Sequence, residues 1–569
     1  KPASVARAPG AVVVRTAGKD AGPTGAAGKA GGQGGKGAKD TRDAKGAKPV
    51  RVDFDGLQRR IVALPVAERN YDSLGVASDG ALFFVERRQP GVSNDPPGGD
   101  DDNNGELYRF DPEKKEAKSL KQGIAGYSLS GDGKKLLLRF GKGRLEAGDA
   151  GEKPDAKPLE LAGLRSFVDP REEWRQIFEE TWWMEKEFFY DANLHGLDWA
   201  AVRERYRPLL AHVQRREDLN ELLVEMIGEL QVGHNRVGGG DTWQETPVGV
   251  GLLGADYELD HDRVRIRHIY RGDRWNPFLK APLAAPGVGV REGDYLLAVN
   301  GRPLDARGNV HALFEGTVGK QVTLGIAADP AGKDLRNVTV EPVGNEVALR
   351  QWAWVERNRE RVEQRGQGRI AYVYMPNTAD AGFQYFNRLF FAQIDKDAVI
   401  VDDRRNGGGQ AANYVLDVLR RPFLAGWKQR EGLDFLTPAG AIYGPKLMLI
   451  DQDAGSGGDF MPFMFQRLGI GPLLGKRTWG GLIGISFNPP LIDGATLTVP
   501  FFRLYTPEGQ WRIENEGVAP DIDVELEPDQ VNRGIDTQLD RAIDEVLQRL
   551  KDYKPPRRTP PPVPTQLGR

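Results

Sequence analysis

Residues 446–486 read KLMLIDQDAGSGGDFMPFMFQRLGIGPLLGKRTWGGLIGIS, which predicts a strand, a sharp turn, a helix and then a glycine-rich loop. The helix is predicted from apolar residues at helical spacing: Phe460, Phe463, Met464 and Leu468. Ser456 therefore stands where a strand gives way to a helix, beside N–H groups without partners in the helix. A covalent nucleophile and its oxyanion hole need this geometry, although a serine here can also simply cap the helix.

Further apolar runs around this stretch predict an α/β domain. Strands are expected at 369–375, 397–403, 446–450 and 471–475, and helices at 346–363, 380–393, 410–420 and 459–468. Alternation of this kind indicates a largely parallel sheet, which binds ligands at the carboxyl ends of its strands. Two glycine-rich loops lie there, 406–409 and 454–458, and a later segment with short strands, 496–524, carries Glu514.

A chain of 569 residues is too long for one core, and about 150 residues per domain predicts three to four domains. The fold class we predict is multidomain α/β and β. We expect a partial strand (11–15) with a flexible Gly/Ala/Lys insert (1–49), the last blades of a β-propeller (50–163), a helical part (164–244), a PDZ-like β domain (245–344), an α/β domain with a mainly parallel sheet (345–552) and a disordered Pro-rich tail (553–569).

The propeller prediction rests on a repeated pattern. SDGALFFV and GDGKKLLLR, which begin at residues 78 and 131, each place an Asp-Gly turn before a strand. Other strands are expected at 105–112 and 118–130. The PDZ-like prediction rests on GVGVREGDYLLAVNGRPL (287–304), in which a strand ends in an Asn-Gly turn.

Composition excludes several classes of function. The net charge is only −3, and no folded segment concentrates positive charge, so we expect no nucleic-acid partner and no attraction to a membrane. There is no cysteine, and no run reaches the roughly 20 apolar residues of a membrane span. We predict a cytoplasmic protein, with the periplasm as the open alternative. The chain begins at Lys1, which suggests that its amino terminus is processed or truncated.

Among catalytic chemistries, a serine nucleophile fits best. The loop RRNGGGQA lacks the lysine and hydroxyl of a phosphate-binding loop. The six histidines are not paired as in HExxH zinc sites, so we expect no metal and no cofactor; they are His195, His212, His234, His261, His268 and His311. A serine needs a base that titrates near neutrality, which is most often histidine.

The motifs together resemble a known family. MIGELQVGHNRV, a PDZ-like insert, VDDRRNGGGQ, DAGSGGDFMPFMFQRLGIGPLLGKRTWGG and IENEGVAPD occur in this order. They are similar to the tricorn-type serine peptidases, relatives of the carboxyl-terminal processing proteases. The resemblance covers the chain from about residue 50 onward.

The resemblance implies roles for particular residues. Ser456 corresponds to the nucleophile and His234 to its general base. The amides of Gly457 and of Gly408 or Gly409 correspond to the oxyanion hole, and Glu514 to the carboxylate of the relay. Asp434 is the nearest candidate for an acidic residue that binds the substrate. The family also implies a homo-oligomer, a hexamer.

Two positions deserve comparison with the family pattern. The relay serine that precedes the histidine in the family is replaced by Gly233. Either Glu514 reaches His234 directly or through water, or another group orients the imidazole, or activity is reduced. The lysine base of the processing proteases aligns with Arg477, which stays charged in proteins, and leaves Lys476 as the weaker candidate.

We therefore expect a serine peptidase that acts on unfolded proteins or oligopeptides, since a PDZ-like insert between the catalytic segments would restrict access. The alternative is a peptide-binding scaffold whose catalytic site has decayed, and Gly233 is the feature that favours it.

Overall fold

The computed structural model describes residues 53–87, 105–161, 163–273, 276, 279–305, 307–485, 488–556 and 560–562. The chain divides into two compact units, Lys1–Pro65 and Val66–Arg569. In the first unit, the described residues include a short 3₁₀ helix, η1 (Leu57–Arg60). The segment 1–49, with its predicted strand at 11–15 and flexible insert, lies outside the described residues, as does most of the predicted tail.

The second unit begins with two antiparallel sheets of four strands each. The first contains β1 (Asn70–Val76), β2 (Leu82–Arg87), β3 (Gly105–Asp111) and β4 (Glu116–Ile124), and the second contains β5 (Gly126–Leu129), β6 (Lys135–Arg139), β7 (Leu145–Asp149) and β8 (Lys157–Pro158). The repeated turns precede β2 and β6, where Gly80 and Gly133 have φ angles of 82° and 68°. The one strand expected at 118–130 is two, because the chain passes from one sheet to the next at Ala125.

A helical region follows, as the amphipathic pattern predicts. It consists of α1 (Pro170–Phe188), η3 (Leu194–Gly196), α2 (Trp199–Tyr206), η4 (Arg207–His212) and α3 (Arg216–Gly228). Asp169 caps α1 through the Arg171 N–H. The buried faces of these helices share one apolar core with the segment around Leu497, which is more than 250 residues further along the chain. The strand β9 (Arg236–Gly238) pairs there with β23 (Thr496–Thr498).

Residues 250–343 form the PDZ-like domain. Its sheet has the order β10-β11-β12-β14-β15, with β13 paired to β12. The strands are β10 (Ala255–Asp260), β11 (Arg263–Ile269), β12 (Tyr295–Val299), β13 (Arg302–Pro303), β14 (Val322–Ala327) and β15 (Arg336–Val340), with η5 (Pro282–Ala284) and η6 (Val310–Phe314) between them. A run of buried aliphatic residues, Leu324 and Ile326 among them, fills its core.

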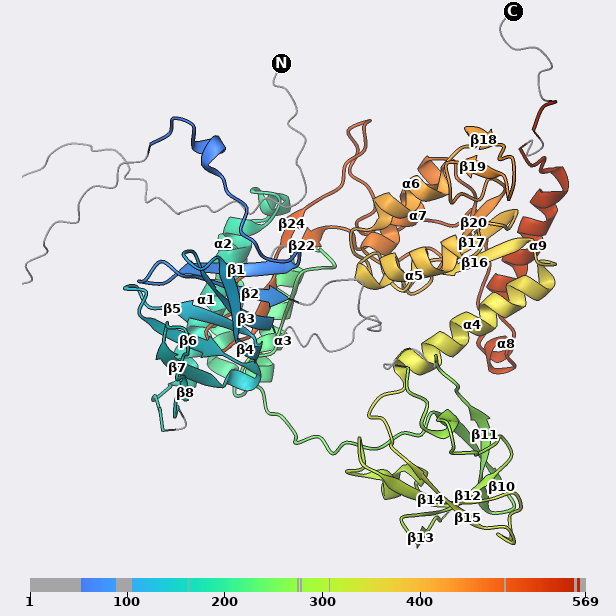
Figure 1. Ribbon diagram of the computed structural model, residues 1–569, viewed down its shortest axis with the longest axis horizontal. Helices are drawn as coiled ribbons and strands as arrows, with labels where there is room; N and C mark the ends of the chain where they lie inside the picture. The colour runs from blue at the N-terminus through green and yellow to red at the C-terminus, as the bar shows by residue number, and fades with distance from the viewer. Residues whose placement is uncertain are drawn as a thin grey trace, which may run out of the picture. The chain divides into compact units, whose positions relative to one another are not determined.

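The α/β domain contains a five-stranded parallel sheet of order β16-β17-β20-β21-β25. Its strands are β16 (Ile370–Tyr374), β17 (Ala398–Asp402), β20 (Lys446–Ile450), β21 (Leu473–Gly475) and β25 (Ile522–Asp523). Helices α5 (Asp380–Phe391), α6 (Ala412–Leu419) and α7 (Gly457–Arg467) lie on one face, and α4 (Val347–Arg365) and α9 (Thr537–Asp552) lie on the other (Figure 1). The central strands are buried on both faces, which explains their continuous apolar sequences.

The remaining elements are short. They are the hairpin of β18 (Ala425–Trp427) and β19 (Phe435–Thr437), the pair β22 (Gly484–Ile485) and β24 (Pro500–Phe502), and α8 (Pro528–Asn532). Within the described part of the chain, no helix is both long and apolar enough to cross a membrane.

Candidate active site

Ser456 lies at the sharp turn between β20 and α7. Its φ is 58° and its ψ is −115°, a backbone conformation that non-glycine residues rarely adopt. Its N–H donates to Asp459 Oδ2 at 2.8 Å and to the Gly481 carbonyl at 3.0 Å, which holds the turn in this conformation. The side chain is half-buried at the start of the helix. The turn therefore presents the hydroxyl beside the first amides of α7.

Asp459 is the residue that fixes this turn. Besides the Ser456 amide, its carboxylate accepts hydrogen bonds from the Gly480 N–H at 2.8 Å, the Gly481 N–H at 3.2 Å and the Thr478 hydroxyl. Burial raises the pKa of Asp459, and these hydrogen bonds oppose the rise. This role of Asp459 was not predicted, although a serine followed three residues later by an acidic residue is a capping-box signal.

The NGGG loop lies against the Ser456 turn. A Cβ placed on Gly408 would be 2.6 Å from Ser456 Cβ, and one placed on Gly457 would be 2.7 Å from the Gly409 nitrogen. The Gly408 N–H already donates to Asn406 Oδ1 at 2.9 Å. Of the two glycines predicted as oxyanion donors, Gly409 is therefore the one that the geometry favours beside Gly457.

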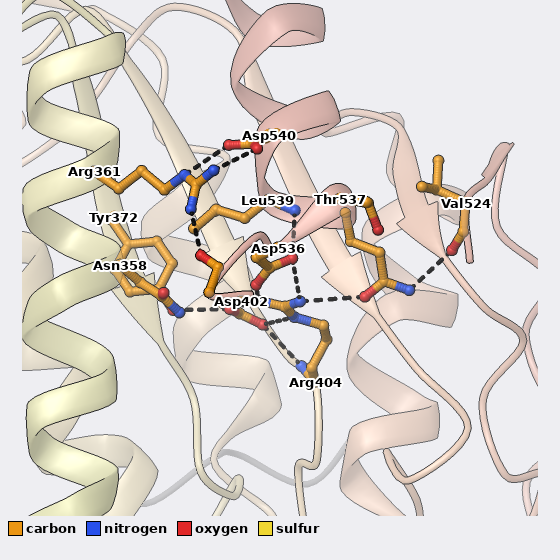
Figure 2. A network of polar contacts seen from close by, with 12 residues as sticks. Asn358, Arg361, Tyr372, Asp402, Arg404, Val524, Asp536, Thr537, Leu539 and Asp540 are labelled. Carbon is orange, nitrogen blue, oxygen red and sulfur yellow. Dashed lines mark hydrogen bonds and ion pairs between the residues drawn. The ribbon is translucent and has the colours of Figure 1, made fainter. Parts of the chain in front are cut away.

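A buried charge network anchors the strand that leads into this loop. The Arg404 guanidinium lies between Asp402, which ends β17, and Asp536, which caps α9 (Figure 2). The arginine nitrogens lie 2.7 Å from Asp402 Oδ2 and 2.9 Å from Asp536 Oδ2, and the Tyr372 hydroxyl donates to Asp402 at 2.7 Å. Because Arg404 is 3 % exposed and Asp402 is fully buried, neither charge has water to replace its partner.

His234 lies on the loop between α3 and β9. The Thr498 hydroxyl donates to its carbonyl at 2.8 Å, and its ring packs against the Trp479 indole with 5.2 Å between centroids. Its Nδ1 is buried and has no hydrogen bond to any residue that the structure describes. Burial lowers the pKa of His234, Arg236 lowers it further, and Glu514 opposes both. The imidazole is therefore neutral at physiological pH and can accept a proton.

Glu514 contacts the backbone around His234. One carboxylate oxygen accepts the Gly233 N–H at 3.0 Å, and the other accepts the N–H groups of Leu482 at 2.7 Å and Ile483 at 2.8 Å. Glu514 thus ties the residue before His234 to the loop that follows Trp479. Its charge acts on the imidazole through space, while its hydrogen bonds act on the main chain.

Trp479 occupies the space between the histidine and serine loops. A Cβ on Gly233 would lie 2.8 Å from its Cζ2, and one on Gly455, next to Ser456, would lie 2.5 Å from its Cε3. The ring therefore fills the position where the side chain of a serine at 233 would begin. The loops of His234 and Ser456 meet across this indole.

The other residues singled out in the sequence are Asp434, Lys476 and Arg477, and each contacts a partner other than Ser456 or His234. Asp434 belongs to the β18–β19 hairpin, where it pairs with Lys428 at 3.2 Å. Lys476 pairs with Asp523 at 2.8 Å and with Glu525 at 3.2 Å, and these carboxylates raise its pKa. Arg477 donates to the Glu516 carbonyl at 2.9 Å. A charged, ion-paired lysine is a poor general base, so the surroundings of Lys476 favour His234.

Comparison with protein families agrees with this architecture. Residues 170–228 match the tricorn protease C1 domain, residues 251–345 the tricorn protease PDZ domain, and residues 369–524 peptidase family S41. In these domains and in their order, the chain is similar to the tricorn-type serine peptidases. These matches confirm the predicted resemblance and the multidomain α/β and β fold class.

Individual relatives in the tricorn family extend the match over most of the chain. The tricorn protease homolog 1 of Streptomyces coelicolor is 35 % identical over 537 residues, which are 90 % of this chain and 48 % of the relative. A putative tricorn-like protease C-terminal subunit of Sulfurisphaera tokodaii is 32 % identical over 88 % of this chain and 58 % of the relative. The crystal structure of the tricorn protease superposes with a TM-score of 0.79 at 26 % identity, over 90 % of this chain and 49 % of that one. The chain thus spans about half the length of these relatives.

Proposed function

We propose that this chain hydrolyses peptide bonds with Ser456 as nucleophile and His234 as general base. The observation that supports it most is the Ser456 turn, which has a strained φ of 58° and packs closely against Gly408 of the NGGG loop. Strain of this kind is retained where surrounding structure enforces it, and it is common at active sites. A role as helix cap alone does not require a left-handed φ.

The proposed reaction uses these groups in the roles that the family resemblance implies. Ser456 Oγ attacks the peptide carbonyl while its proton passes to neutral His234, and the carbonyl oxygen becomes an oxyanion bound by the Gly457 and Gly409 amides. The imidazolium then protonates the leaving amine, and the C–N bond breaks to leave an acyl-enzyme. Water, deprotonated by His234, attacks the ester carbonyl; the imidazolium then returns its proton to Ser456 Oγ as the C–O bond breaks, which releases the acid product and free Ser456. Glu514 favours the imidazolium in each step through its negative charge.

For the substrate, we propose unfolded proteins or short peptides. The PDZ domain, residues 251–345, is inserted between the segments that carry His234 and Ser456. An insert at this position would restrict access to the site, so an extended chain could enter it more readily than a folded domain. The relatives are named as proteases of the tricorn type, which is consistent with this class of substrate. Asp434 as a determinant of the cut site stays a prediction, because its carboxylate is already paired with Lys428.

We also propose that the chain self-associates, as the family resemblance implies. Light scattering coupled to size-exclusion chromatography would measure the mass in solution directly. A mass near 62.8 kDa at all concentrations would contradict self-association.

The test of the catalytic assignment is reaction with a fluorophosphonate, which phosphonylates activated serines. We expect peptide mapping to find the adduct on Ser456 in the wild type, and no adduct in Ser456→Ala. In His234→Ala the labelling rate should fall by roughly 10³-fold or more, because the base is lost. Circular dichroism of each variant provides the control for folding.

A second function competes with this one: a peptide-binding scaffold whose catalytic site has decayed. Gly233 favours it, as does the Nδ1 of His234, which has no hydrogen bond to a described residue, since no hydroxyl at 233 orients the imidazole. Peptide binding without turnover, and without adduct on Ser456 in a folded protein, would support the scaffold and contradict the peptidase.

A further inference from the structure

A carboxyl group that has no role in the proposed reaction is buried beside the loop that carries His234. We call this loop, residues 229–235, the base loop. Glu185 lies in the last turn of α1 with no exposed surface, in the same helix as buried Thr181. Burying a carboxyl without compensating contacts is unfavourable, because the group loses its hydrogen bonds to water. Because an apolar side chain could fill this position without that penalty, we expect the Glu185 carboxyl to have a specific function.

Its contact is Asn235, which directly follows His234. In the orientation that satisfies both ends of its amide, the Asn235 nitrogen donates to Glu185 Oε1 at 2.8 Å and to the Thr498 carbonyl at 3.2 Å. Thr498 in turn donates its hydroxyl to the His234 carbonyl. Helix α1, the base loop and β23 are thus joined by polar contacts at one point.

The charge state of Glu185 suits this contact. Burial raises its pKa to about 8, and the Asn235 hydrogen bond opposes the rise. The group is therefore mainly a neutral carboxylic acid at pH 7, whose carbonyl oxygen accepts the Asn235 hydrogen bond. Its second oxygen, Oε2, is buried and makes no hydrogen bond with any described residue.

A second carboxyl, that of Glu514, holds the base loop on the amino-terminal side of His234. The Gly233 N–H, directly before His234, donates to Glu514. Both neighbours of the histidine are thus tied to a buried carboxyl, while Nδ1 of the ring itself has no described partner. With no hydroxyl at residue 233, the direction of the imidazole depends on where the loop is placed.

We infer that Glu185 is a positioning residue: through the side chain of Asn235, it holds His234 in place. This inference rests on the proposed role of His234 as general base. A shift of about 1 Å in a catalytic group can reduce a rate by as much as 100-fold, so loss of the Glu185–Asn235 contact should appear in the chemical step.

The test measures the rate of Ser456 labelling by a fluorophosphonate in four single variants and one double variant of the full chain. Glu185→Met keeps the size of the side chain but cannot accept the hydrogen bond, and Glu185→Gln keeps a neutral acceptor. Asn235→Ala removes the donor, and Thr181→Val changes a buried hydroxyl of the same helix that has no described hydrogen bond. We expect the maximal labelling rate to fall by about tenfold in Glu185→Met and in Asn235→Ala, with half-saturating probe concentration unchanged.

The double variant and the conservative variant separate positioning from general stability. Glu185→Met combined with Asn235→Ala should be no slower than either single variant, because both remove the same contact. Glu185→Gln should restore the rate to within about threefold of the wild type, and Thr181→Val should leave it unchanged. Additive losses in the double variant, or an equal loss in Thr181→Val, would overturn the inference. Absence of labelling in the wild type would overturn the proposed function itself, whereas equal labelling of wild type and Glu185→Met would overturn only the role of Glu185.

Discussion

The two loops that form the proposed site are held by different means. The loop 404–409 continues directly from a central strand, and buried neighbours such as Asp402, Arg404 and Asn406 fix its polar groups. The His234 loop is half-buried, and the ring Nδ1 of His234 has no hydrogen bond within the described part of the chain. Residues from distant parts of the chain hold this loop through its backbone. The loop 404–409 thus depends on the fold of one domain, whereas the His234 loop depends on contacts between segments more than 250 residues apart.

The largest effect on stability is expected at Arg404. Arg404→Met leaves the carboxylates of Asp402 and Asp536 without their cation, and removal of one partner from a buried pair typically costs about 3–5 kcal/mol. Chemical unfolding followed by circular dichroism measures this loss. Arg405→Met is the matched control, because that side chain is exposed and should change stability by less than about 0.5 kcal/mol. Equal effects of the two substitutions would contradict the anchoring role of the network.

The second prediction concerns the glycines of the same loop. Gly409 has a φ of 130°, and a Cβ there would be 2.5 Å from the Ala379 nitrogen. Gly409→Ala should therefore displace the amide that we propose as an oxyanion donor and lower kcat by about 10²-fold, as loss of one such donor does. Gly407→Ala provides the control, since its Cβ would meet no atom nearer than the Pro376 carbonyl oxygen at 4.0 Å. If both variants hydrolyse peptides equally well, the oxyanion hole does not include Gly409.

The contrast between the loops also explains what could be predicted from the sequence. The α/β domain was predictable because each buried strand is a short apolar run, and 446–450 matches β20 at both ends. Ser456 and the NGGG loop follow such strands directly. Strand β10, with alternating polar residues, and the break at Ala125 lack this signal.

The contacts around His234 were harder to predict from the sequence, for a physical reason. Its contacts join Glu514, Glu185 and Thr498 to residues 233–235 through the folded chain, and no local spacing encodes them. Resemblance to the family indicated His234 and Glu514 but not how the carboxylate reaches the loop. Neither Trp479 nor Asn235 was identified, because an aromatic residue or an amide in a loop has no periodic pattern.

The third prediction is the pH dependence of the reaction. His234 must be neutral to accept the serine proton, and burial lowers its pKa from the ordinary value of 6.5. Activity should therefore rise with pH along a limb below 6.5 and reach a plateau above it. The pH profile of kcat/KM with a peptide substrate measures the position of this limb.

Two substitutions of nearby charges should move this limb in opposite directions. Arg236→Gln should raise the pKa of His234 and move the limb to higher pH, because the arginine disfavours the imidazolium. Glu514→Gln should move it to lower pH, because the carboxylate favours the charged ring. Glu514→Gln should also lower the rate at the plateau, since the amide group cannot accept all three backbone N–H groups. A limb that neither substitution moves would show that His234 is not the titrating group.

The smallest effect is expected at Gly233, and it decides between the peptidase and the decayed scaffold. A serine there would bring back the hydroxyl of the family relay, but its Cβ would lie 2.8 Å from the Trp479 ring, which has to give way. If Trp479 and the flanking carboxyls already place His234, Gly233→Ser should cost about 1 kcal/mol of stability through overpacking and change the labelling rate of Ser456 by less than about threefold. Gly233→Ser combined with Trp479→Phe, which leaves a smaller ring, should recover the lost stability. A gain in labelling of tenfold or more on restoring the hydroxyl would instead mean that the wild-type site lacks an essential group, because an imidazole that is already oriented gains little from a second support.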